Sequence, residues 1–507
     1  MAECRVHPKI STTFSLVFVR SRDQLFRVVT AKMSPKQPVL PLSYMCLKVI
    51  SNQVTVALSD DEGKYYQVVQ EYLADATYEV LQDLLRMILN CITLDAGIRF
   101  SCLEVLLRED VKKLDTGIFP WFYYEKILQT IKLRGKRLQQ LNLKGVWVRD
   151  YPEELTDLIE NLPHLRTLVM PHMASDDVIE AVCSLKHLTM LDICGEACYT
   201  VEGIRKLHSD KLQVLDIGNF GKRDICQEED SGPELVAELM MNCPNLSSVK
   251  TYSYTGSSLL LIYEKNPSYR TKLKYIHDTG TTLKSMEAIT TLCPDLETVH
   301  LESPEQEVLE NLSKLRKLHT LKLVKYSAQE LTDYLRISGS QIQVLKLSRV
   351  KDVALDLSVL SSLIPNLVTL ECFQMKLTFS DAGSYFMSLQ NVEFLYCDMS
   401  DDVIRFVLMN APFLRRMVVG CVILMTDGDI FRMCAESDFT NLEELWFSCA
   451  KCLTATSVEL LMGHCPNLKV IGQLTGWDLH QEELDYLKVV IAATNTDLTL
   501  LPVGSFA

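Results

Sequence analysis

The sequence predicts an α/β solenoid in which a curved parallel sheet lines the inside and helices cover the outside, with a small helical box at the N-terminus. A short apolar pattern, Leu138-Gln-Gln-Leu141-Asn-Leu143, carries this prediction, because its first, fourth and sixth residues are apolar. The same spacing returns at starts that are mostly about 22 to 28 residues apart, which is the period of leucine-rich repeats. Before residue 131 this pattern is absent, and apolar residues follow helical spacing instead.

The recurrence continues almost to the C-terminus, so stacked units rather than several separate cores account for the 507 residues. Each unit is expected to form a strand, a turn and a helix, with about fourteen repeats over residues 131–490. Ser175 and Ser400 each precede two aspartates, which suits the start of a helix. The later copies of the pattern are Leu165/Leu168/Met170, Leu188/Leu191/Ile193, Leu212/Leu215/Ile217, Leu273/Ile276, Leu296/Val299/Leu301, Leu318/Leu321/Leu323, Ile342/Leu345/Leu347, Leu367/Leu370/Cys372, Val392/Leu395/Cys397, Leu414/Met417/Val419, Leu442/Leu445/Phe447 and Leu468/Ile471.

Composition narrows the class of protein. The formal net charge of -14 argues against the basic face that nucleic-acid binding requires, and we find no apolar run long enough for a membrane span. The 17 cysteines are odd in number and scattered. Cys243, Cys293 and Cys465 each precede a repeat strand, where a small buried side chain fits. We therefore expect reduced cysteines in an intracellular protein. The expected compartment is the cytoplasm, with the nucleus as a further option, and neither nucleic acid nor a membrane is expected as a partner.

The outer segments differ in composition from the repeats. Residues 1–36 carry seven Lys or Arg against Glu3 and Asp23. We expect a disordered leader there, with a mitochondrial presequence as the alternative. Residues 37–130 are expected to form the helical box, and residues 491–507 a C-terminal tail.

Three helices are expected in the box. Leu42, Cys46 and Ile50 recur at every fourth residue behind Pro41, which gives the first helix an apolar stripe. Apolar spacing over 80–89 and 102–107 predicts the second and third helices. Such a stripe is typical of a helix that packs on its own domain, and composition alone does not separate that role from docking on a partner.

The first helix also resembles a known docking motif. Pro41-Leu42-Ser-Tyr-Met-Cys46-Leu-Lys-Val-Ile50 resembles the BC box, the helix by which substrate receptors dock on elongin C. The resemblance implies that Leu42 anchors in an apolar pocket of the partner, that the small Cys46 allows close approach, and that Ile50 extends the contact. This is the helix-in-groove mode of recognition.

The order of helical box and repeats resembles the zygote-defective (zyg) family of receptors for cullin-2 ubiquitin ligases. The resemblance places a cullin box at Leu73, Val80 and Leu84, and it implies elongin B, elongin C and cullin-2 as partners. Leu73-Ala74 stands where the family has an apolar residue followed by proline, and the family's armadillo-like domain after the repeats has no counterpart here. The expected function is therefore substrate recognition for a cullin-RING ubiquitin ligase, without the family's substrate preference.

Two alternatives remain. F-box proteins also join an N-terminal three-helix box to repeats with segments like Cys465-Pro466-Asn467-Leu468, and Leu40-Pro41 resembles an F-box opening. Against this, Cys46 and Lys48 interrupt the aliphatic run that an F-box has. The alternative from another class is a leucine-rich-repeat scaffold or inhibitor that binds one protein and recruits no ligase.

The predicted strands also indicate where a protein substrate binds. Strand alternation points the fifth and seventh residues of each repeat away from the helices, and aromatic residues occupy these positions in the later repeats. Aromatic residues flanked by charge are typical anchors of protein interfaces. We therefore predict that Phe373, Tyr396 and Trp446 bind the substrate, and that Glu371 and Asp398 select a basic segment. The middle repeats carry His277, His300, Lys322 and Lys346 at the corresponding positions.

Enzyme signatures are weak. Gly218-Asn-Phe-Gly221-Lys222 lacks the spacing of a phosphate-binding loop, and neither a Gly-x-Ser-x-Gly nor a His-Glu-x-x-His motif occurs. Cys449 and Cys452 form one CxxC without a second pair, and the histidines show no ligand spacing. We expect a non-catalytic protein with no metal, no cofactor and no small-molecule partner.

Overall fold

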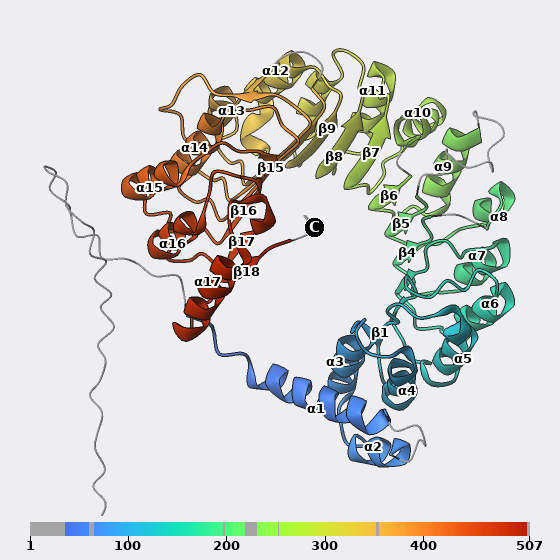
Figure 1. Ribbon diagram of the computed structural model, residues 1–507. Coiled ribbons are helices and arrows are strands. Elements are labelled where there is room, and N and C mark those ends of the chain that lie inside the picture. The colour runs from blue at the N-terminus through green and yellow to red at the C-terminus, as the bar shows by residue number, and fades with distance from the viewer. Residues whose placement is uncertain are drawn as a thin grey trace, which may run out of the picture.

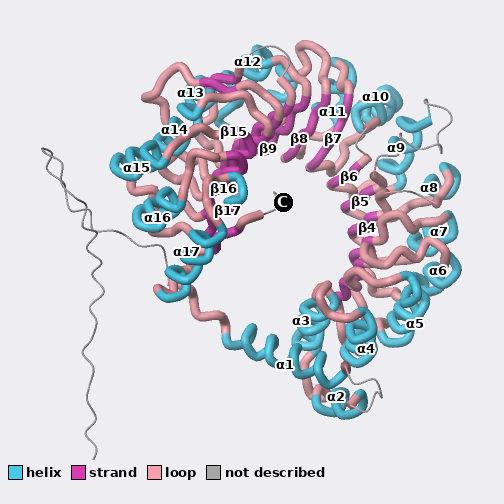
Figure 2. The backbone as a smooth tube through the Cα atoms, viewed as in Figure 1, coloured by secondary structure: helices cyan, strands magenta, loops and turns pink. Residues whose placement is uncertain are grey.

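The computed structural model describes residues 36–59, 65–195, 198–218, 231–251, 253–350 and 354–503, so the expected leader lies outside it except for Lys36. Within these ranges, 16 strands form one parallel sheet whose order follows the chain, and two short strands, β11 and β13, pair separately. The strands line the inside of a strongly curved molecule and the helices cover its outside (Figure 1, Figure 2). The predicted α/β leucine-rich-repeat solenoid is confirmed.

The strands are short, as the repeat pattern requires. They are β1 Lys113–Asp115, β2 Gln140–Asn142, β3 Thr167–Val169, β4 Met190–Asp192, β5 Val214–Asp216, β6 Ser248–Lys250, β7 Tyr275–Thr279, β8 Thr298–Glu302, β9 Thr320–Val324, β10 Val344–Ser348, β11 Leu355–Asp356, β12 Thr369–Phe373, β13 Leu377–Thr378, β14 Asn391–Leu395, β15 Arg416–Val422, β16 Glu444–Cys449, β17 Val470–Gly472 and β18 Thr499–Leu501.

The helices alternate with the strands after the N-terminal group. They are α1 Leu42–Leu58, α2 Tyr66–Tyr72, α3 Tyr78–Leu89, α4 Ala96–Leu106, α5 Tyr124–Arg134, α6 Pro152–Glu160, α7 Asp176–Cys183, α8 Val201–Arg205, α9 Ser231–Asn242, α10 Thr255–Lys265, α11 Leu283–Leu292, α12 Ala328–Ser338, α13 Leu357–Leu363, α14 Asp401–Asn410, α15 Asp427–Glu436, α16 Ala455–His464 and α17 Gln481–Ala493. Among the described helices, none combines the length and the apolar run that a bilayer crossing requires.

Strand alternation places the leucines of the pattern between the sheet and the helices. In β9 and β10, Leu321 pairs with Leu345 and Leu323 with Leu347, and all four side chains are buried. The intervening Lys322 lies half-buried on the opposite, inner face of the sheet. Burying one leucine contributes about 1.5–3 kcal/mol. Each repeat is therefore held mainly by the few apolar side chains that it buries between the sheet and the helices.

One predicted register is wrong. The pattern Val392/Leu395/Cys397 would align Leu395 with Leu370, but in the structure Val392 aligns with Leu370, and Phe394 follows it into the core. The repeat therefore begins at Leu389, whose side chain is fully buried. Both registers satisfy the same apolar spacing, and the larger Phe394 fills the core better than a cysteine.

The sheet is longer than the residues 131–490 predicted for the repeats. β1 begins at residue 113 and β18 ends at residue 501, while β6 occupies a position for which no strand was predicted. β1 and β6 each carry one buried apolar residue, Leu114 or Val249, followed two positions later by a buried threonine, Thr116 or Thr251. The threonine replaces the third apolar residue of the pattern, so the pattern is incomplete there. The end of α17 and the whole of β18 lie within the expected tail.

The helical box contains the three predicted helices, α1, α3 and α4, and a shorter one, α2. The second half of α1 packs against α3 and α4, where Val54 is buried. The guanidinium of Arg99 is buried beneath Phe119 and donates to the carbonyls of Leu89 and Ile118 at 3.3 and 2.6 Å. This pairing ties α3 and α4 to the first repeat.

The two ends of the described chain lie side by side. The Gln37 amide donates to the Asn495 carbonyl at 3.0 Å, the Lys36 ammonium donates to the Thr494 carbonyl at 2.6 Å, and Lys36 forms an antiparallel bridge with Thr496. From this contact, the residues that follow Gln37 cross to α1, and the curve is thereby closed into a ring (Figure 1).

Candidate functional site

The first half of α1 carries an exposed apolar surface. Leu42 is 72% exposed, and Met45, Cys46 and Val49 are also exposed on the following turns. Ile50 is half-buried and packs against the core, so it lies where the exposed half of the helix meets the anchored half. Leu42 and Cys46, two of the three residues predicted to contact an adaptor, are therefore available to a partner, and Ile50 is available in part.

The residues predicted for cullin contact are less accessible. Leu73 is 7% exposed and Leu84 is fully buried, while Val80 is half-buried against the same core. The Arg108 guanidinium donates to the carbonyls of Leu73 and Ala74 at 3.3 and 2.8 Å, which satisfies backbone groups at the end of α2. Leu73 and Leu84 thus hold the helical box together and do not form a surface with Val80.

Among the residues predicted to bind a substrate, Phe373 and Tyr396 lie together on the inner face. Their ring centroids are 5.6 Å apart with the planes at 82°, an edge-to-face pair. Phe373 lies at the end of β12, as strand alternation predicts. Tyr396 instead follows the last residue of β14 and has a φ of 53°, so this turn, and not a strand position, directs its ring. It is 70% exposed.

The two predicted acidic residues differ in their surroundings. The Glu371 carboxylate accepts an ion pair from the Lys346 ammonium at 2.8 Å, so its charge is partly neutralised within the sheet. The Asp398 side chain lies beyond β14, is 79% exposed, and approaches the Lys376 ammonium only to 3.9 Å. Asp398 is the more available of the two carboxylates for a basic segment of a partner.

Trp446 lies on the inner face of β16, separate from the Phe373 and Tyr396 pair. Its indole N–H donates to the Glu444 carboxylate at 3.2 Å, and its ring lies over Gly472 of the next strand. β14 and β15 separate β16 from β12, so the three aromatic residues lie along the same face without forming one cluster. Val418 fills the position beside Trp446 on β15.

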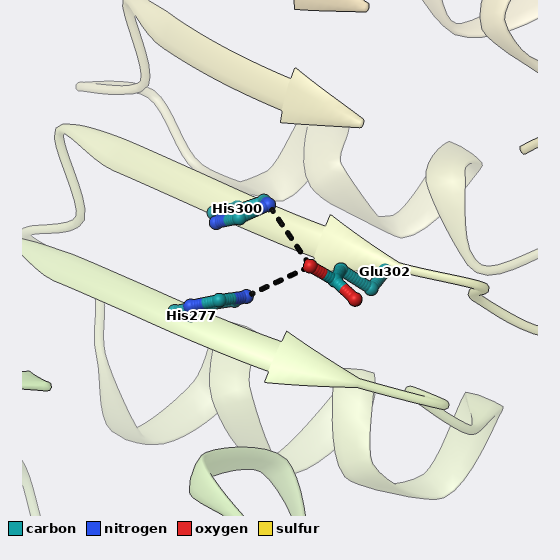
Figure 3. Close-up of side chains that lie close together, drawn as sticks. All are labelled: His277, His300 and Glu302. Carbon is teal, nitrogen blue, oxygen red and sulfur yellow. Dashed lines mark ion pairs between the residues drawn. The ribbon is translucent and has the colours of Figure 1, made fainter. Parts of the chain in front are cut away.

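A further group of side chains occupies the inner face at β7 and β8. His277 and His300 are paired in register on these two strands, and their rings stack with centroids 3.7 Å apart. Both Nε2 atoms point toward the carboxylate of Glu302, at 3.6 Å from His277 and 3.9 Å from His300 (Figure 3). Both imidazoles are more than nine-tenths buried, whereas the Glu302 side chain is 42% exposed.

Burial controls the protonation of this histidine pair. It lowers the pKa of His300 to about 3, and the neighbouring charges of His277 and Lys322 act in the same direction. Burial also lowers the pKa of His277, although the Glu302 carboxylate acts against this shift. Both rings are therefore neutral near pH 7, the form in which imidazole nitrogens accept hydrogen bonds or bind metal ions.

Sequence reasoning did not bring these three residues together. His277 and His300 both occupy the fifth position of consecutive repeats, and Glu302 occupies the seventh position of the second one. Linear spacing of the kind found within one helix or one loop does not reveal them, because parallel strands place residues side by side that are separated by a whole repeat. Alignment of the repeats puts His277 and His300 at the same position, and reading the seventh position of the second repeat as well would have added Glu302 to them.

Comparison with known proteins finds only distant similarities. Among solved structures, the chain is similar to a chain of the Rad7 and Elc1 complex of yeast, with 14% identity and a TM-score of 0.38, over 91% of this chain and 98% of that one. It is also similar to an internalin (inlF) from Listeria monocytogenes, with 13% identity and a TM-score of 0.37, over 70% and 89% of the two chains. No protein-family model and no curated protein matches the chain.

Proposed function

We propose that this chain is the substrate-recognition subunit of a cullin-RING ubiquitin ligase, present in the cytoplasm and nucleus, and that it docks on elongin C through the first half of α1. The observation that supports this most is the apolar surface formed by Leu42, Met45, Cys46 and Val49 on a helix whose second half is anchored in the protein's own core. A helix held in this way presents its apolar side chains without an ordering cost on binding. Catalysis would belong to the partner enzymes, and this chain would hold the substrate near them.

The adaptor contact is tested by co-purifying the full chain with elongins B and C. Leu42→Ala removes the proposed anchor, and burial of one leucine is worth about 1.5–3 kcal/mol. We expect the affinity for the elongins to fall by roughly tenfold or more. Val56→Ala is the matched control, since Val56 lies on the anchored half of α1 and is equally exposed at 72%. It should leave elongin binding unchanged.

Neither variant should change the melting temperature, because both side chains are exposed. Failure of the wild-type chain to capture either elongin would refute the adaptor assignment. Capture of the F-box adaptor instead would establish the alternative receptor class, and capture of neither adaptor would favour a scaffold or inhibitor that recruits no ligase.

Cullin-2 is the proposed cullin. It would contact exposed residues of the helical box such as Val68 and Tyr72.

We propose that the protein substrate binds along the inner face, with Phe373, Tyr396 and Trp446 as apolar contacts and with Asp398 and Glu371 facing a basic segment. The double variant Phe373→Ala, Tyr396→Ala should still bind the elongins but lose the ubiquitylated proteins that depend on the wild-type chain in cells. The double variant Phe431→Ala, Tyr486→Ala is the control, because Phe431 and Tyr486 are exposed aromatic residues of the outer helices α15 and α17. Equal ubiquitylation profiles for the two double variants would contradict the assignment.

A further inference from the structure

We propose that His277, His300 and Glu302 bind a divalent transition-metal ion of the zinc class on the inner face of the sheet. This inference is independent of the ligase function, since it depends only on the arrangement of side chains on β7 and β8. The three residues offer two imidazole nitrogens and one carboxylate oxygen, and all these ligand atoms lie within 4.8 Å of one another (Figure 3).

The repeat architecture creates this arrangement. In-register pairing of parallel strands places His277 beside His300, and the two-residue period of a strand places Glu302 on the same face as His300. The Nε2 atoms lie 3.6 and 3.9 Å from the Glu302 Oε1. Zinc bonds of about 2.0–2.2 Å in tetrahedral geometry place neighbouring ligand atoms roughly 3.3–3.6 Å apart. Small rotations of the imidazoles would therefore bring the ligand atoms to bonding positions.

The state of His300 gives an independent indication of a missing ligand. Its side chain is more than nine-tenths buried, and no group among the described residues forms a hydrogen bond with its Nε2 atom. A buried polar atom without a partner costs about 1–3 kcal/mol. This nitrogen points toward the Glu302 carboxylate at a distance too long for a hydrogen bond but suited to a shared ion.

The donor atoms select the kind of ion. Imidazole nitrogens favour zinc, copper, nickel, cobalt and iron over magnesium and calcium, which prefer sites made entirely of oxygen. Three protein ligands leave a fourth position, and the exposed side of Glu302 opens it to the inner face. Water, or a side chain of a bound protein, could fill this position. Lys322 lies half-buried beside His300 on β9, so its positive charge opposes binding of the ion.

The site is tested on the metal-free full chain by titration with Zn²⁺ in a calorimeter and with Co²⁺ in an absorption spectrometer. We expect one ion to bind with nitrogen and oxygen ligands, which give Co²⁺ no thiolate charge-transfer band. His300→Gln and Glu302→Gln should each weaken binding by at least tenfold. His319→Gln is the matched control, because His319 is half-buried beside β9 and hydrogen-bonds to Thr320 outside the cluster.

Circular dichroism and thermal unfolding of the metal-free variants separate loss of the site from loss of the fold. Binding should also raise the melting temperature of the wild-type chain and not that of Glu302→Gln. Unchanged Zn²⁺ affinity in folded His300→Gln and Glu302→Gln would overturn the proposal. A thiolate band that disappears in Cys194→Ser would also overturn it, since it would place the ion at the separate cluster of Asp192, Cys194 and Asp216.

Discussion

At the scale of single residues, the inner face depends on the fit between neighbouring strands, and Trp446 with Gly472 is the sharpest case. A Cβ atom added to Gly472 would lie 2.0 Å from Cε3 and 2.4 Å from Cζ3 of the Trp446 ring. The ring can occupy this position only because the neighbouring residue has no side chain. Trp446 is therefore held in place before any partner binds.

We predict that Gly472→Ala displaces the Trp446 ring and destabilises the protein by about 1–3 kcal/mol, as overpacking does. A shift in tryptophan emission together with a lower melting temperature would show both effects. Gly463→Ala in α16 is the control, because a Cβ there would meet no atom within 4 Å. Alanine within a helix should stabilise by about 0.5–1 kcal/mol. Wild-type emission and melting temperature for Gly472→Ala would contradict the proposed fit.

The residue scale also shows where sequence reasoning succeeded and failed. Alternation along a strand placed Phe373 and Trp446 on the inner face correctly, because a strand has a fixed two-residue period. It could not place Tyr396, since a left-handed turn directs that ring after the strand has ended. It placed His277 and His300 at corresponding positions of neighbouring repeats, but it did not join them with Glu302 into one cluster.

At the scale of the helices and strands, a carboxylate at the start of one helix joins successive repeats. Asp427, the first residue of α15, accepts hydrogen bonds from the amide and hydroxyl of Thr454 at 3.0 and 2.8 Å, and from the Ser457 hydroxyl at 2.5 Å. Asp176 accepts from Thr200 in the same way, at 2.6 and 2.8 Å. The aspartates therefore do more than favour the positive end of their own helix, because they also bind the N-cap threonine of the next one.

This contact predicts a dependence of stability on pH. Burial acts to raise the pKa of Asp427, but the hydrogen bonds from Ser457 and Thr454 outweigh it and hold the pKa below its usual value. A lowered folded-state pKa contributes stability above the unfolded-state value of about 3.9, and this contribution is lost as the pH falls through the folded-state value.

Asp427→Asn removes this contribution and leaves one of the donors without its acceptor. We expect its melting temperature to lie below that of the wild type by a constant amount between pH 7 and 5, and the difference to narrow below about pH 4. Asp177→Asn is the control, because Asp177 is exposed in the first turn of α7. Its pH profile should follow that of the wild type. A difference for Asp427→Asn that persists at low pH would exclude the ionised carboxylate as the cause.

The order of strands and helices was largely predictable, because one spacing repeats along the chain and each copy buries the same positions. The failures have two physical causes. Thr116 and Thr251 follow directly after β1 and β6 and are buried where the pattern expects an apolar residue, so a search for apolar residues alone passes over these two strands. In β14 two registers satisfy the spacing equally, and only packing against the neighbouring repeats selects Phe394 for the core.

At the scale of the whole molecule, a solenoid is held by contacts between neighbouring repeats, so its two ends are its least stable parts. Here the ends meet, because Lys36 and Gln37 pair with the segment from Thr494 to Thr496. No sequence pattern predicted this contact, since the pairing joins the boundary between the expected leader and the expected helical box to a segment of the expected tail. It ties the segment that leads into α1 to the last repeat, so the helical box and the last repeat are joined across the ring.

We predict that the contact slows local opening of the last repeat. Gln37→Pro removes the amide that donates to the Asn495 carbonyl at 3.0 Å. Amides of α17 and β18 should then exchange faster with deuterium, while those of β8 to β10 in the middle of the sheet should exchange as in the wild type. Val39→Ala is the control, since Val39 is exposed and lies in the same segment. If the amides of α17 and β18 exchange at the same rate in both variants, the two ends touch without stabilising each other. The last repeat would then be held by β17 and α16 alone.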